Sequence, residues 1–311
     1  MRDQGDTEGA DRFATVPSGT TICFRDFGNP TDPALLLIAG LGEDIDAWGG
    51  EFVAALVARG FRVITMDNRD IGRSTFLSRP APMLWRQVLA RPRKDAYALA
   101  DMAADATGVL DHLGVGRVHL VGRSMGGMIA QTIAATVPDR VRSLTSIYST
   151  TGAKKVGQPA LSTIAILCAP PPRDRAAAIR AHLRITRHVA GKRYPMDEAT
   201  ETAMAARAWD RHAGDIAAGA ARQIQAIQAS GDRTAQLQRI TAPTLVIHGD
   251  RDPLVGPSGG DATARAIRAA QHVTIPGMGH HIPRALVNTI TGYIAEHAHS
   301  VEKGGENVRI S

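Results

Sequence analysis

The sequence predicts an α/β protein with a mostly parallel central sheet, helices on both faces of that sheet and one inserted helical segment. Short apolar strands alternate with amphipathic helices along most of the 311 residues, an order typical of βαβ units. The strands are almost continuously apolar, as expected of strands buried on both faces. From about residue 152 to residue 236 only helical periodicity is present, and the alternation then resumes. We therefore expect one domain with an insertion, not two domains in tandem.

The first part of the core, residues 1–151, contains the elements that precede the insertion. Strand patterns cover residues 21–28, 34–40, 61–67, 117–122 and 141–149. Helical patterns between them cover residues 48–60, 97–114 and 125–138. The proline-bounded stretch 80–92 interrupts the route from the third strand to the next helix. It predicts a second, smaller excursion at the edge of the sheet where the insertion emerges.

The insertion, residues 152–236, is expected to be a helical cap. It has an apolar face at helical spacing, formed by Ile216, Ala220, Ile224 and Ile227. The second part of the core follows over residues 237–299, with strand patterns at 243–249 and 272–277 and helical patterns at 261–270 and 284–297. Residues 300–311 show no periodicity, so a flexible tail is expected there.

Composition and charge exclude several classes of protein. The net charge of +6 arises in residues 153–235, which contain 13 Lys and Arg but only 7 Asp and Glu. The rest of the chain contains 23 basic and 23 acidic residues. These cations are scattered and few aromatic residues accompany them, so a solvated basic face is expected and not a nucleic-acid site. No apolar run approaches the roughly 20 residues of a membrane span. The acidic, polar first dozen residues do not resemble a secretory signal.

The cysteines and histidines give no sign of a metal or redox site. Cys23 and Cys168 lie far apart and neither belongs to a CxxC motif, so a disulfide framework is not expected. A reducing cytoplasm is therefore the expected location. None of the 11 histidines has metal-ligand spacing, and neither a metal nor an organic cofactor is expected.

A serine flanked by glycines carries the strongest chemical signal. Gly122, Ser124 and Gly126 form the pattern G-x-S-x-G between an apolar strand and an amphipathic helix, which is the context of a nucleophile elbow. So tight a turn strains the backbone and leaves no room for side chains at the two glycines. A phosphate-binding loop would need G-x-G-x-x-G or G-x-x-x-x-G-K-[ST], and neither pattern fits. We therefore expect Ser124 to be a nucleophile.

A serine nucleophile needs a base, and that base needs an orienting carboxylate. His280 follows a strand and a glycine turn near the C-terminus, which is where the chain order Ser, acid, His would place the base. Spacing alone leaves His281 as its rival. For the acid, the loop "GDRDP" offers Asp250 and Asp252, either of which could cap a turn. We prefer Asp252 and expect Asp250 and His248 to shape the loop.

The elbow "GRSMGG", the acid loop "HGDRDPLV" and the base turn "GMGHH" stand in the chain order of the α/β-hydrolase superfamily, which this sequence resembles from about Thr20 to His297. That family's helical cap corresponds to the insertion, and "MDNRDIGRS" is similar to its D-x-R-G-x-G-x-S loop. Within the superfamily, "DNRDIGRST", "SMGGMIAQ" and "IPGMGHHIP" resemble small bacterial carboxylesterases, including the group that contains aclacinomycin methylesterase. Epoxide hydrolases and haloalkane dehalogenases use Asp as nucleophile, so serine at position 124 implies acyl transfer.

Two departures from the family pattern concern the loops beside the nucleophile. The family commonly has His-Gly-x after its third strand, whereas this chain has Ala39, Gly40 and Leu41. The resemblance implies an oxyanion hole formed by the backbone N–H groups of Leu41 and Met125, without the usual histidine. Asp70 stands where the family loop usually has glycine. It is either a local backbone adjustment or an extra carboxylate near the site.

These residues predict a serine carboxylesterase that cleaves a small-molecule ester through an acyl-enzyme. The alternatives are a methylesterase or other tailoring hydrolase acting on a polyketide-like molecule, a perhydrolase, a C–C hydrolase, and a ligand-binding protein with little turnover. The basic insertion adds an acidic or membrane-surface substrate to the possibilities. Candidate pocket residues are Trp85, Arg123, Tyr194 and Trp209, and Arg123 would meet either a substrate carboxylate or a structural acid. The sequence specifies no oligomeric state.

Overall fold

An eight-stranded, mostly parallel sheet forms the centre of the protein. The computed structural model describes the backbone of residues 9–306, with side chains as far as Lys303. The strands are β1 (Arg12–Thr15), β2 (Thr21–Phe27), β3 (Ala34–Ile38), β4 (Arg62–Met66), β5 (Val118–Arg123), β6 (Val141–Ile147), β7 (Thr244–Gly249) and β8 (Gln271–Ile275). They lie in the order β1-β2-β4-β3-β5-β6-β7-β8. Every neighbouring pair from β4 to β8 is parallel, which confirms the predicted fold class.

The first strand was not predicted from the sequence. β1 pairs antiparallel with β2, with Arg12 opposite Phe24, and β2 pairs antiparallel with β4. Three of the four residues of β1 are exposed, and only Ala14 is buried. A strand so short and so exposed has no clear apolar alternation, because it covers an edge of the sheet instead of crossing its core.

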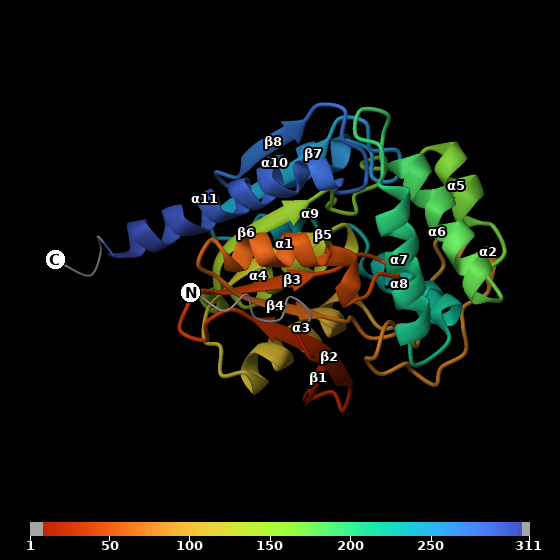
Figure 1. Cartoon of the computed structure of the whole chain (residues 1–311), viewed down its shortest axis with the longest axis horizontal. Helices are drawn as coiled ribbons and strands as arrows, with labels where there is room; N and C mark the ends of the chain where they lie inside the picture. The colour runs from red at the N-terminus through yellow and green to blue at the C-terminus, as the bar shows by residue number, and fades with distance from the viewer. Residues whose placement is uncertain (1–8, 307–311) are drawn as a thin grey trace.

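Helices cover both faces of the sheet, as the alternating pattern predicted (Figure 1). On one face lie α3 (Leu99–His112) and α4 (Met125–Thr136), packed against Leu36 of β3. On the other lie α1 (Gly50–Val57) and α11 (Val287–Glu306), packed against Leu35 and Leu37 of the same strand. Successive side chains of β3 thus enter opposite cores, which explains why the strand is apolar at every position. In residues 9–306 no helix is both long enough and apolar enough to cross a bilayer.

The stretch predicted to be helical lies between β6 and β7. It contains α5 (Leu161–Leu167), α6 (Arg175–Val189), α7 (Glu198–Arg211), α8 (Ile216–Ser230) and α9 (Thr234–Leu237). Asp174, Asp197 and Asp215 cap α6, α7 and α8 by accepting hydrogen bonds from backbone N–H groups. Figure 1 shows α5 to α8 gathered at one end of the molecule, with α11 reaching away at the opposite end. The 80–92 excursion contains the short helix α2 (Leu84–Val88).

The remaining elements are short connectors and one further helix. The 3-10 turns are η1 (Ile45–Trp48), η2 (Pro138–Arg140) and η3 (Arg284–Leu286), and α10 (Ser258–Ala266) precedes β8. α10 packs against β7.

The C-terminal prediction needs a correction. The flexible tail was expected from residue 300, but α11 continues to Glu306. Glu302, near the end of this helix, forms an ion pair with Arg142 of β6, with 2.6 Å between Arg142 Nη1 and a carboxylate oxygen. That contact joins residues far apart in the sequence, so local periodicity did not reveal it. Residues 307–311 of the predicted tail lie outside the described residues.

Asp70, the unusual residue of the 67–75 loop, joins α8 to the sheet. Its carboxylate receives two hydrogen bonds from Arg222, at 2.9 and 2.6 Å, and a third from the Leu77 N–H at 2.9 Å. Both charged side chains are buried. Asp70 has a φ of +68°, and a Cβ at Gly219 of α8 would overlap its carbonyl oxygen. The extra carboxylate therefore anchors α8, and Gly219 permits the close approach.

Removal of either partner of this ion pair should destabilise the protein. We expect Asp70→Asn and Arg222→Met each to lower the free energy of unfolding by about 3 kcal/mol, because each leaves a buried charge or donor unpaired. The double variant should lose less than the sum of the two. Urea denaturation of wild type, the two single variants and the double variant measures these free energies of unfolding. If each single variant lost less than about 0.5 kcal/mol and the two losses were additive, the pair would not anchor α8.

Candidate active site

Ser124 occupies a strained turn between β5 and α4. Its backbone has φ +53° and ψ −122°, a conformation that is costly for a residue with a side chain. A Cβ at Gly122 would overlap the Gly126 carbonyl, and a Cβ at Gly126 would overlap the Ile38 carbonyl of β3. The Ser124 N–H donates to the Ile147 carbonyl of β6 at 2.9 Å. Neighbouring strands on both sides therefore hold the turn, and only glycine fits at the two flanking positions.

The candidate site residues follow the carboxyl ends of neighbouring parallel strands. β3, β5, β6 and β7 are adjacent in the sheet and parallel to one another. Gly40 and Leu41 follow β3, Ser124 follows β5, Tyr148 follows β6 and Asp252 follows β7. Parallel strands end at one edge of a sheet, so residues more than 200 positions apart in sequence lie together.

Asp252 and His280 form a buried pair. His280 Nδ1 lies 2.6 Å from Asp252 Oδ2, and the two side chains are only 7% and 0% exposed. Asp252 Oδ1 accepts the N–H groups of Leu254 and Val255, both at 2.8 Å. An ionised carboxylate can only accept hydrogen bonds, so the proton of this pair belongs on Nδ1. His280 Nε2 is then the nitrogen with a free lone pair.

The surroundings keep Asp252 ionised. Burial by itself raises the pKa of its carboxyl, but the charge of His280 and hydrogen bonds from His248 and His280 outweigh burial and lower the pKa to about 2. Asp252 therefore carries its negative charge throughout the neutral and mildly acidic range.

The inserted helices position His280. The His280 N–H donates to the Val189 carbonyl of α6 at 2.7 Å. A Cβ at Gly279 would overlap that same carbonyl oxygen, so the glycine before His280 is needed for this approach. The Tyr148 ring packs against the His280 imidazole, with 4.4 Å between the ring centroids and 49° between the ring planes. The imidazole is thus held by the insertion, by the end of β6 and by Asp252.

The structure separates Asp252 and His280 from the alternatives that the sequence left open. Asp250 accepts the Gly277 N–H at 2.6 Å and so braces the turn that precedes His280. His248 Nε2 lies 2.8 Å from the Val255 carbonyl oxygen. His281 Nε2 instead lies 3.5 Å from Glu201 of α7. Of the two aspartates of the loop, Asp252 pairs with His280 and Asp250 does not.

Two backbone N–H groups beside Ser124 are free to bind an oxyanion. Neither Leu41 nor Met125 donates its N–H to another residue within the described chain. Met125 begins α4, whose dipole favours negative charge at that end. The loop that carries Leu41 lies against the serine, since a Cβ at Gly40 would stand 3.3 Å from Ser124 Cβ. In the described structure Ser124 Oγ and His280 Nε2 form no hydrogen bond, a contact that often tightens only with substrate.

Arg123 points to a structural acid. Its Nε donates to Glu43 Oε2 at 2.8 Å, and its guanidinium lies 4.9 Å from the centroid of the Trp48 ring. The Arg123 side chain is only 8% exposed, whereas that of Glu43 is 37% exposed. Burial by itself lowers the pKa of Arg123, but the charge of Glu43 raises it above its ordinary value. Arg123 therefore stays charged and paired.

The other predicted pocket residues are spread over the excursion and the insertion. Trp85 of α2 is 45% exposed, with Arg86 stacked on its ring. Tyr194 follows α6 and is half-buried, and Trp209 of α7 packs against His212 at 5.1 Å. Among the described contacts, no hydrogen bond or ring packing joins Trp85, Tyr194 or Trp209 to Ser124 or His280.

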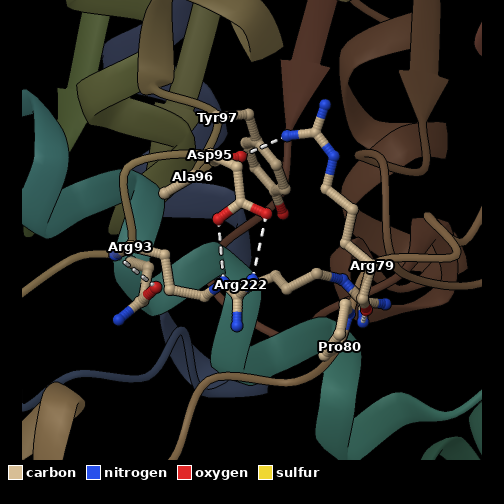
Figure 2. Close-up of a pocket in the computed structure, with 8 residues that line it drawn as sticks. Arg79, Pro80, Arg93, Asp95, Ala96, Tyr97 and Arg222 are labelled. Carbon is tan, nitrogen blue, oxygen red and sulfur yellow. Dashed lines mark hydrogen bonds and ion pairs between the residues drawn. The ribbon is translucent and has the colours of Figure 1, made fainter.

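A small pocket beside α8 is lined by charged residues that bond to one another or to neighbouring groups. It is lined by Arg79, Pro80, Arg93, Asp95, Ala96, Tyr97, Arg222 and Gln225. Figure 2 shows Arg93 and Asp95 paired inside it, with a distance of 2.8 Å between Arg93 Nε and Asp95 Oδ1. Arg222 Nη1 donates to the Arg79 carbonyl at 3.0 Å at one side. None of the predicted catalytic residues lines this pocket, and its Arg93 and Arg222 are already paired with carboxylates.

Sequence reasoning missed Glu43, Tyr148 and Gln223. Tyr148 directly follows β6, which lies between β5 and β7 in the sheet. A residue at the end of that strand could therefore have been expected near Ser124 and Asp252. Glu43 lies three residues after Gly40 and accepts its N–H at 2.6 Å, a spacing that a short turn allows. Gln223 lies on α8 and accepts the Gly42 N–H at 2.9 Å. Nothing local in the sequence connects residues 42 and 223.

The arrangement of sheet, elbow and buried Asp–His pair defines the class of protein. Residues 33–283 match the family described as the alpha/beta hydrolase fold, and the chain belongs to this family. The chain is 29% identical over 301 residues to the rhodomycin D methylesterase DnrP of Streptomyces peucetius, covering 89% of this chain and 94% of that protein. The resemblance to the methylesterase group that the sequence motifs predicted is confirmed by this relative.

Solved structures agree with this assignment. A hydrolase from Pseudomonas aeruginosa PA01 superposes with a TM-score of 0.67 at 26% identity, covering 94% of this chain and 98% of that one. An esterase from Rhodococcus sp. ECU1013 superposes with a TM-score of 0.69 at 23% identity, covering 94% and 98%. At that identity the second likeness concerns the fold alone.

The depressed pKa of Asp252 predicts how its contribution to stability depends on pH. An Asp whose pKa falls from 3.8 to about 2 on folding stabilises the folded state by about 2 kcal/mol. This contribution is complete above pH values near 4 and disappears as the pH falls through about 2. We expect Asp252→Asn to lower the free energy of unfolding by about 2 kcal/mol at pH 6 and by progressively less below pH 4. Urea denaturation at several pH values measures the difference, and a difference independent of pH would contradict the assignment.

Proposed function

We propose that this protein is a serine esterase that cleaves a small-molecule carboxylic ester through an acyl-enzyme. The observation that carries the proposal is the buried contact of 2.6 Å between Asp252 and His280 at the strand edge where the elbow presents Ser124. A serine is a poor nucleophile unless a base takes its proton, and an imidazole oriented by a carboxylate is suited to that task. The methylesterase relative supports an ester as the substrate class.

In the proposed reaction, Ser124 Oγ attacks the ester carbonyl carbon while His280 Nε2 takes the hydroxyl proton. The carbonyl oxygen becomes an oxyanion, which the N–H groups of Leu41 and Met125 stabilise. When the tetrahedral intermediate collapses, the bond to the alcohol oxygen breaks and His280 returns the proton to the departing alcohol. A water molecule then repeats the attack on the acyl-enzyme, and the acid and free Ser124 are released. Asp252 keeps the imidazole oriented and stabilises its positive charge.

The inserted helices serve as a cap in this proposal. The backbone of α6 holds His280 through Val189, and α8 is anchored to the 67–75 loop through Arg222 and Asp70. A segment tied to both catalytic loops is placed to select the acyl and alcohol groups that reach Ser124. The sequence relationship to rhodomycin D methylesterase DnrP favours methyl esters of bulky acids as the first substrates to test.

Replacement of the nucleophile tests the reaction. We expect Ser124→Ala to lower kcat on a p-nitrophenyl ester by about 10⁴-fold or more, since loss of a triad serine leaves only binding and oxyanion stabilisation. A fluorophosphonate should label the wild-type protein at Ser124, and mass spectrometry of the intact protein and its peptides detects the adduct. Hydrolysis at the wild-type rate by the variant would disprove the mechanism. Absence of an adduct on wild type, with no turnover, would favour a ligand-binding protein of the same fold.

A substrate series tests the proposed substrate class. p-Nitrophenyl esters of increasing acyl length and a methyl ester of a bulky polycyclic acid are compared by kcat/KM. If methyl esters of bulky acids are the natural class, the methyl ester should exceed a methyl ester of a small aliphatic acid by about tenfold or more, which corresponds to about 1.4 kcal/mol of additional binding in the transition state. Equal values for the two methyl esters would argue against that class.

A further inference from the structure

The loop that carries Leu41 has an unusual set of contacts. We propose that Glu43 and Gln223 are positioning residues that hold the loop of residues 40–43, here called the oxyanion loop, so that its Leu41 N–H remains available to an oxyanion. This inference rests on the proposed esterase reaction. This chain lacks the histidine that the family commonly has before the loop. Glu43 and Gln223, which no sequence motif indicated, would hold the loop instead.

Three of the four backbone N–H groups of residues 40–43 have an acceptor. The Gly40 N–H donates to Glu43 Oε2 at 2.6 Å, and the Gly42 N–H donates to Gln223 Oε1 at 2.9 Å. The Glu43 N–H donates to the Gly40 carbonyl at 3.3 Å. The Leu41 N–H makes no hydrogen bond in the described structure. A free N–H flanked by two bonded ones is what a preorganised oxyanion hole requires, because little reorganisation is then needed during the reaction.

Glu43 accepts hydrogen bonds from its own loop and from the strand that leads to Ser124. Its Oε2 receives the Gly40 N–H and also Arg123 Nε, at 2.8 Å. Arg123 is the residue directly before Ser124, so one carboxylate oxygen ties the oxyanion loop to the elbow. The negative charge of Glu43 would repel a nearby oxyanion if it were alone, but the buried guanidinium of Arg123 neutralises it. The ion pair thus provides an acceptor close to Ser124 without a net charge.

Gln223 ties the same loop to the inserted helices. It is fully buried on α8, where its Oε1 accepts the Gly42 N–H and its Nε2 donates to the Arg69 carbonyl at 2.8 Å. Just before the loop, Asn68 Nδ2 donates to the Ala39 carbonyl at 3.1 Å. Gly42 itself has a φ of +67°, so the loop bends there without steric strain. Movement of α8 would therefore alter the oxyanion loop directly.

The first test compares variants at the two positions. Glu43→Ala and Gln223→Met each remove an acceptor and should lower kcat about 10- to 100-fold, while KM changes less than about threefold. The expected loss is smaller than the loss of about 100- to 1,000-fold caused by removal of a whole oxyanion donor, because the Leu41 N–H is displaced but still present. Glu43→Gln keeps an acceptor oxygen for the Gly40 N–H and should restore kcat to within about fivefold of wild type. Equal losses for Glu43→Ala and Glu43→Gln would overturn the role of Glu43 as an acceptor.

A tetrahedral inhibitor separates loop positioning from a general structural role. An aryl trifluoromethyl ketone adds to Ser124 and places an oxyanion between Leu41 and Met125, so its Ki should rise by the same factor by which kcat/KM falls. Matched controls are Gln228→Met on α8, which faces the Gln87 carbonyl, and Glu51→Ala on α1, which pairs with Arg284. Both controls should keep the wild-type kcat and Ki. Thermal melting confirms that each variant is folded.

The outcomes distinguish this inference from the proposed function. If wild type is neither labelled by the fluorophosphonate nor inhibited by the ketone, the proposed esterase reaction itself fails. If wild type responds to both and Ser124→Ala is inactive, the reaction stands. In that case, folded Glu43→Ala and Gln223→Met variants with wild-type kcat and Ki would overturn the positioning roles. A fall in kcat without a change in Ki would overturn them as well.

Discussion

The strained turn at Ser124 is the constraint on which the rest of the structure depends. A positive φ at a residue with a side chain costs about 1–3 kcal/mol, and this cost is offset by the packing on both sides of the turn. Met125, Ile129 and Ile133 of α4 are fully buried in the core on one face of the sheet. The Ile38 carbonyl of β3 lies where a side chain at position 126 would be. Ser124 is thus held between a strand and a helix that are both packed in the core.

Buried charges, in addition to apolar contacts, attach the inserted helices to the sheet. Arg211 of α7 lies 2.8 Å from Asp67, 3.3 Å from Asp44 and 3.2 Å from Asp11. Arg222 of α8 is paired with Asp70 in the same loop region. Such contacts contribute less net stability than apolar packing, because both charges must leave water. They are directional, however, so they define where each helix lies relative to the loops that carry Asp44, Asp67 and Asp70.

Much of the fold could be predicted because its signals are local. The alternation of strands and helices and the elbow glycines are all visible within windows of a few to about 15 residues. The helical stretch between β6 and β7 has the same kind of signal. The exceptions have non-local causes. β1 is short and covers an edge of the sheet, and the end of α11 is tied to the sheet by Arg142 and Glu302, which are distant in sequence.

The sequence by itself determined the fold class and the three motifs that carry Ser124, Asp252 and His280, because each motif depends on backbone geometry within a few residues. Only the tertiary structure brought Asp252 and not Asp250 to His280, and only it showed that Glu43 and Gln223 accept the Gly40 and Gly42 N–H groups. These choices depend on contacts between strand ends and inserted helices that are distant in the chain. Such contacts arise from the packing of the whole sheet, and spacing along the sequence does not encode them in a readable form.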